Sequence, residues 1–91
     1  MKKLTPERRE IVLQAIASGK TAFDEYTLRK LNTFTDEGRK VIGVYWKAQG
    51  TILECLNLSM TRVYELIQGE KSLDDFYNLD GKPKKMGKTN G

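Results

Sequence analysis

The sequence predicts an all-α protein: a small bundle of five or six short helices, followed by a disordered, basic C-terminal tail. Two observations lead to this fold class. Apolar residues recur every three or four positions, as on the buried face of a helix, and residues that favour helix starts and ends punctuate the chain. No segment alternates apolar and polar residues for long enough to predict a β-sheet.

The first two helices are expected between residue 5 and residue 31. Thr5 and Pro6 are typical of an N-cap and a first helical turn, and Gly19 is expected to end this helix. Thr21 with Asp24 is the cap pattern of a second helix. The apolar residues expected to face the core are Ile11, Val12, Ala15 and Ile16 in the first helix and Phe23, Tyr26, Leu28 and Leu31 in the second.

The third helix is predicted to start at Thr35, which is a good N-cap followed by two acidic residues that favour a helix N-terminus. Its expected core residues include Val41, Val44 and Ala48, and Gly50 is expected to break it. A final short helix is predicted after Ser72, with Leu73, Phe76 and Leu79 on its buried side.

Residues 51–69 are predicted to form two helices joined by a tight turn. Thr51 with Glu54 is a capping-box pattern that starts the first helix. Asn57 tolerates the left-handed backbone of a turn, and Ser59 is the expected N-cap of the second helix. Val63, Leu66 and Ile67 follow at the spacing of one buried helical face, and Gly69 is the expected C-cap.

This segment, TILECLNLSMTRVYELIQG, resembles the helix-turn-helix of bacterial and phage DNA-binding proteins, in which a pattern such as ALGVSRSTVYRLI forms the turn and the recognition helix. In this chain the usual turn glycine is Asn57, and the usual small residue of the first helix is Leu53 or Glu54. A looser resemblance runs from Thr35 to Leu66 and is to region 4 of sigma factors. The resemblance implies a small DNA-binding protein, a bacterial or phage transcription regulator that binds double-stranded DNA, as a homodimer in many such proteins.

Nine residues are the candidates for contact with DNA if the second helix of the motif enters the major groove. The N-terminal part of that helix would read bases, with Arg62 pairing with guanine and Thr61 contacting a base or a thymine methyl group. Phosphate contacts would come from the outward side of the helix, from a helix N-terminus near residue 51 and from basic residues upstream. The candidates are Ser59, Met60, Thr61, Arg62, Tyr64, Lys47, Thr51, Arg39 and Lys40.

The net charge of +4 is concentrated at the end of the chain. Four lysines against one aspartate give residues 80–91 a charge of +3, so residues 1–79 carry only +1. We therefore divide the chain into a helical domain, 1–79, and a disordered Lys-rich tail, 80–91. The near-neutral domain, with its acidic stretch from Glu70 to Asp75, favours an alternative: a protein-binding module, such as a phage-type inhibitor or anti-repressor. A third reading is a protein that touches both DNA and a polymerase.

The remaining composition argues against other classes of protein. The chain has one cysteine, Cys55, and no histidine, so neither a disulfide nor a thiolate or imidazole metal site is expected. We expect no catalytic site and no cofactor, because the paired acidic residues, Asp36–Glu37 and Asp74–Asp75, fall in first turns of helices. No apolar run approaches the roughly 18–20 residues of a membrane span, so a cytoplasmic protein is expected.

Overall fold

The computed structural model describes residues 2–29 and 34–84, which form three α-helices and one short 3-10 helix. Helix α1 spans Pro6–Arg29, α2 spans Asp36–Leu56, α3 spans Met60–Gln68, and η1 spans Leu73–Asp75. The all-α prediction is confirmed, because the described part of the chain contains no strand and only an isolated bridge between Tyr77 and Pro83. The predicted number of helices, five or six, was wrong.

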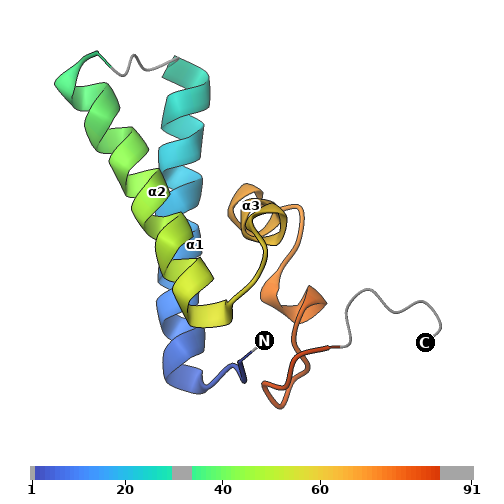
Figure 1. Cartoon of the computed structure of the whole chain (residues 1–91). Coiled ribbons are helices and arrows are strands. Elements are labelled where there is room, and N and C mark those ends of the chain that lie inside the picture. The colour runs from blue at the N-terminus through green and yellow to red at the C-terminus, as the bar shows by residue number, and fades with distance from the viewer. Residues whose placement is uncertain (1, 30–33, 85–91) are drawn as a thin grey trace.

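The two long helices form an antiparallel hairpin, and α3 crosses one face of it (Figure 1). The molecule is elongated and flat, with extents of 47 × 28 × 16 Å. Helix α3, η1 and both terminal segments gather around one half of the hairpin, while the other half extends beyond them (Figure 1). We call these halves the base, residues 6–19 and 45–56, and the arm, residues 20–29 and 36–44.

Gly19 does not end a helix, and the first two predicted helices are the single helix α1. A glycine inside a helix costs only about 1 kcal/mol relative to alanine, which the packing of neighbouring elements can offset. The packing here is close: a Cβ added at Gly19 would lie 3.1–3.3 Å from side-chain carbons of Ile67. Gly19 is therefore the point at which α3 approaches α1.

Gly50 and Thr51 likewise lie inside a continuous helix, so the predicted break before residue 51 was also wrong. The Thr51 hydroxyl donates to the carbonyl oxygen of Lys47 over 3.0 Å, which is a bond within the helix and not an N-cap. The third predicted helix and the first helix of the motif are consequently one element, α2.

The other predicted helix ends agree with the structure. The side chains of Thr35 and Ser59 accept hydrogen bonds from the backbone N–H groups of Gly38 (3.0 Å) and Arg62 (3.4 Å). Asn57 adopts the left-handed conformation, with φ 53°, and Gly69 does so with φ 83°. The last helix is the single 3-10 turn η1.

The core lies in the base, between the hairpin, α3 and the C-terminal segment. Ile11, Val44 and Leu79 were expected in it, but all three side chains are exposed. The side chains of Tyr26 and Leu28, and the whole of Leu31, lie outside the described part of the chain. The large buried core residues are Leu4, Val12, Ile52, Leu56, Leu58, Val63, Leu66, Ile67, Leu73, Phe76 and Tyr77.

The two ends of the described chain are joined at the base. The N–H of Leu4 donates to the carbonyl oxygen of Gly81 over 2.7 Å, and the N–H of Lys84 donates to that of Phe76 over 2.9 Å. Gly81 is buried and has φ 86°, a conformation that favours glycine. Residues 80–84, which were expected to open a disordered tail, thus make defined backbone contacts. Residues 85–91 lie outside the described part.

Candidate nucleic-acid interface

The connection between α2 and α3 consists of only three residues, each with a distinct role. The N–H of Asn57 donates to the carbonyl oxygen of Leu53 over 2.8 Å and ends α2 in the left-handed conformation. Leu58 is buried in the core, and Ser59 caps α3. Because the middle residue is anchored and both flanking residues are hydrogen-bonded, the position of α3 relative to α2 is well determined.

Helix α3 has one buried and one exposed face. Val63, Leu66 and Ile67 are fully buried against the hairpin and the C-terminal segment. Ser59 and Thr61 are exposed, as are Met60 (47% exposed) and Tyr64 (38% exposed). Three of the four residues predicted to read bases therefore lie together at the surface, on the first turn of the helix.

Arg62, the fourth, contacts a neighbouring aromatic ring. Its guanidinium carbon lies 5.4 Å from the centroid of the Phe76 ring, and its side chain is half-buried. Phe76 itself is buried beside η1, so this cation–π contact directs Arg62 toward the C-terminal segment. The strongest predicted base reader is thus engaged within the molecule.

Tyr64 belongs to an aromatic cluster formed by Phe23, Tyr45, Trp46 and Tyr64, which come from all three α-helices. Ring centroids lie 5.9 Å apart for Tyr45 and Tyr64, 5.6 Å for Tyr45 and Trp46, and 6.2 Å for Tyr45 and Phe23. Burial, together with the adjacent Tyr64, raises the pKa of Tyr45 well above its usual range. The Tyr45 phenol therefore stays protonated at neutral pH.

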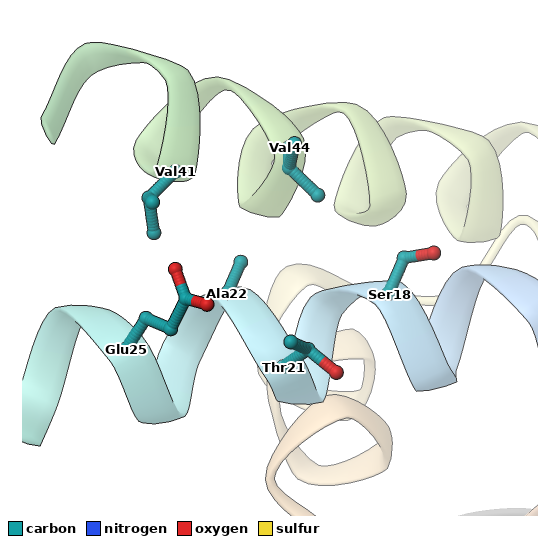
Figure 2. Close-up of a pocket in the computed structure, with 6 residues that line it drawn as sticks. All are labelled: Ser18, Thr21, Ala22, Glu25, Val41 and Val44. Atoms are coloured by element: carbon teal, nitrogen blue, oxygen red, sulfur yellow. The ribbon is translucent and has the colours of Figure 1, made fainter. Parts of the chain in front are cut away.

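Lys47 and Thr51 line a shallow groove along the seam between α1 and α2. The α3-facing residues of the hairpin, Gly19 and Tyr45, lie on a different side of it. Figure 2 shows part of this groove, with Ser18 on α1 and Val44 on α2. Because α2 is continuous at residue 51, it has no free N-terminal amide groups there, and the predicted phosphate anchor at Thr51 was based on a wrong helix boundary.

Arg39 and Lys40 are exposed near the start of α2. The rise of an α-helix places Arg39 about 25 Å along the axis from Leu56, where the turn to α3 begins. Arg39 also forms an ion pair with Asp36 in the same helix. The nine candidates therefore fall into separate regions: the first turns of α3, the groove and the arm.

Two further contacts complete the surroundings of α3, and the first of them was not predicted from the sequence. Arg9 of α1 and Asp74 of η1 approach to 3.7 Å, linking these elements across the base. A hydrogen bond from the Ser72 backbone N–H lowers the pKa of Asp75, with Ser72 and Asp75 closing a capping box. The pattern of Ser72 and Asp75 signalled this cap in the sequence, whereas nothing local signalled that Phe76 would meet Arg62.

No helix within residues 2–29 and 34–84 is both long and apolar enough to cross a membrane. The same residues contain no cluster of three or more side chains of the types that ligate metal ions. No protein-family model, no curated protein and no solved structure matches this chain.

Proposed function

We propose that this protein is a small helix-turn-helix protein that binds double-stranded DNA through the first turn of α3, as a bacterial or phage transcription regulator. The observation that supports this proposal is the turn at Asn57–Ser59, which buries one face of α3 and leaves Met60 and Thr61 exposed. A recognition helix needs an exposed N-terminal edge of this kind to enter a major groove.

The exposed edge offers two kinds of contact. The Thr61 hydroxyl can hydrogen-bond a base edge, and Met60 offers apolar surface to a thymine methyl group. The N-terminal end of α3 carries the positive end of the helix dipole, which favours a nearby phosphate. Together these groups provide one positioning contact and a small reading surface.

Arg62 can contact a base only after its side chain has moved away from the Phe76 ring. The cation–π contact is worth about 0.5–1 kcal/mol at an exposed site, and a bidentate guanine contact about 1–3 kcal/mol. The guanine contact is the larger of the two, so a duplex with a guanine in reach recruits Arg62. We therefore propose that Arg62 adds sequence preference while Thr61 and Met60 make the first contact.

The test is a titration of fluorescent duplex DNA with the protein across a salt series. We expect binding that weakens steeply as the salt concentration rises, because binding releases counterions from the DNA.

Arg62→Ala should lose about 1–3 kcal/mol of binding free energy on the best site. Lys2→Ala is the control: it removes one positive charge from an exposed residue outside the α3 edge and the groove, and should bind normally. A variant ending at Lys84 keeps the terminal contacts and separates the effect of the last residues. Undetectable binding at low salt would refute the proposal.

The alternative, a protein-binding module, is favoured by a different observation. Trp46 is exposed and packs on Tyr45, which also contacts the exposed Tyr64 of α3. Met60 of α3 is exposed as well, and aromatic and methionine side chains are enriched in protein interfaces. Such a partner would be a polymerase or another regulator. Retention of one specific bacterial protein by the wild type, and its loss in Trp46→Ala with DNA binding absent in both, would support this alternative.

A further inference from the structure

The groove on the hairpin is continuous along much of the seam between α1 and α2. Its two adjoining hollows share Ser18 and Val44 (Figure 2). The lining residues recur at alternating steps of three and four, the pattern of two helices packed side by side. They include Ile11, Ser18 and Ala22 on α1 and Val41, Val44 and Ala48 on α2. Because several of these side chains are small, the seam is hollowed and not filled.

Large aliphatic side chains at the groove remain exposed to solvent. Ile11 and Val44, which line the same hollow from the two helices, are both among the exposed large hydrophobic residues. Helix α3 covers a different side of the hairpin, and no other described segment covers this one (Figure 1). An apolar helical surface of this kind is usually buried against another element.

We propose that the groove is the interface of a homodimer in which a second copy packs its own groove against this one, running in the opposite direction. The charges along the groove support this occupant. Glu25 lies in the hollow at the arm end, and Lys47 lies in the hollow at the base end. Reversing one copy brings Glu25 of each copy toward Lys47 of the other, so the surface is complementary to itself.

The centre of the interface is lined by small, uncharged side chains. Ser18 and Val44 lie in both hollows, so the two-fold axis passes near them. Because residues near a two-fold axis meet their own counterparts, Val44 of one copy packs on Val44 of the other, with the small Ser18 and Ala48 beside them. The dimer would consist of two packed layers, each formed by one α1–α2 hairpin, and both α3 helices would stay uncovered. This inference is independent of the proposed DNA binding, because it does not use the exposed edge of α3.

The test measures self-association of the full chain by sedimentation equilibrium. Val44→Glu would bury a carboxylate at the centre and should raise the dimer dissociation constant by about a hundredfold. Leu13→Glu is the matched control, because Leu13 is exposed to nearly the same extent as Val44 (43% against 45%) but lies outside the groove. It should leave the dimer intact. Thermal melts of both variants at low concentration check that each one folds.

The direction of packing has its own test. Glu25→Lys and Lys47→Glu should each weaken the dimer by about two- to fivefold, and the double variant should recover wild-type association. A double variant weaker than either single variant would overturn the reversed arrangement. A wild type that stays monomeric at its highest soluble concentration, or a Leu13→Glu variant as impaired as Val44→Glu, would overturn the interface itself.

Discussion

The base and the arm are built from the same two helices but are stabilised in different ways. In the base, Val12, Ile52 and Leu56 are fully buried by α3 and the C-terminal segment. In the arm, among the residues whose side chains are described, only Ala22 and Gly38 are buried. The arm is instead specified by local features: the Thr35 cap, the acidic first turn of α2 and the Asp36–Arg39 ion pair. One helix can thus depend on tertiary packing at one end and on capping at the other.

The largest expected effect is in the base. Ile52→Ala removes a fully buried side chain and should lower the free energy of unfolding by about 2–5 kcal/mol in a urea titration. Val41→Ala, in the arm, removes a half-buried side chain and should cost about 1 kcal/mol. Equal losses for the two variants would show that the arm is packed as firmly as the base.

The joined ends should be the next most sensitive part of the base. Gly81→Ala forces a side chain into a left-handed conformation, and its Cβ would collide with the carbonyl oxygen of Leu4. We expect a loss of about 1–3 kcal/mol. Amide hydrogen exchange should show lost protection at Leu4 while α1 keeps its own. Unchanged protection at Leu4 would mean that this hydrogen bond does not hold the N-terminal segment.

Gly19 and Gly50 both lie inside helices, but Gly19 is packed against another helix and Gly50 is not. Gly50 has open space around its Cα, so Gly50→Ala should stabilise the protein by about 0.5–1 kcal/mol through helix propensity alone. Gly19→Ala should fail to give this gain, because the new methyl group presses on Ile67. Thermal unfolding of both variants measures the difference. An equal gain at both positions would show that α3 can shift away from α1.

The smallest effect concerns pH. Because the pKa of Asp75 is lowered in the folded protein, the stability that this carboxylate adds is complete above its ordinary value of 3.8 and is lost as the pH falls through the folded value. Asp75→Asn should therefore show a shallower loss of stability in acid than the wild type. Urea titrations at a series of acidic pH values provide the measurement, and parallel curves would exclude this contribution.

The features that could be predicted from the sequence are those set within about one helical turn. Ser59 and Asn57 were assigned correctly because a cap depends on backbone groups three or four residues away. The buried stripe Val63, Leu66 and Ile67 was correct for the same reason, since it follows from helical periodicity.

Two of the features that were predicted wrongly depend on contacts between residues far apart in the sequence. Gly19 was interpreted as a helix end, but it lies inside α1, where the absence of a side chain lets Ile67 of α3 approach closely. Arg62 was expected to be available for contact with DNA. In the structure it packs against Phe76, which lies near it because the chain turns at η1. The position of α3 in the sequence could therefore be predicted, but the contact between Arg62 and Phe76 could not.

The Leu4–Gly81 hydrogen bond has a consequence for the order in which the protein is assembled. The hairpin and α3 can form while the ribosome is still elongating the chain, because their contacts lie mostly upstream of η1. The N-terminal segment, residues 2–5, cannot dock until residue 81 has been synthesised, because Gly81 is the hydrogen-bond partner of Leu4. Until then the Leu4 side chain, which is buried in the folded protein, remains exposed on the nascent chain.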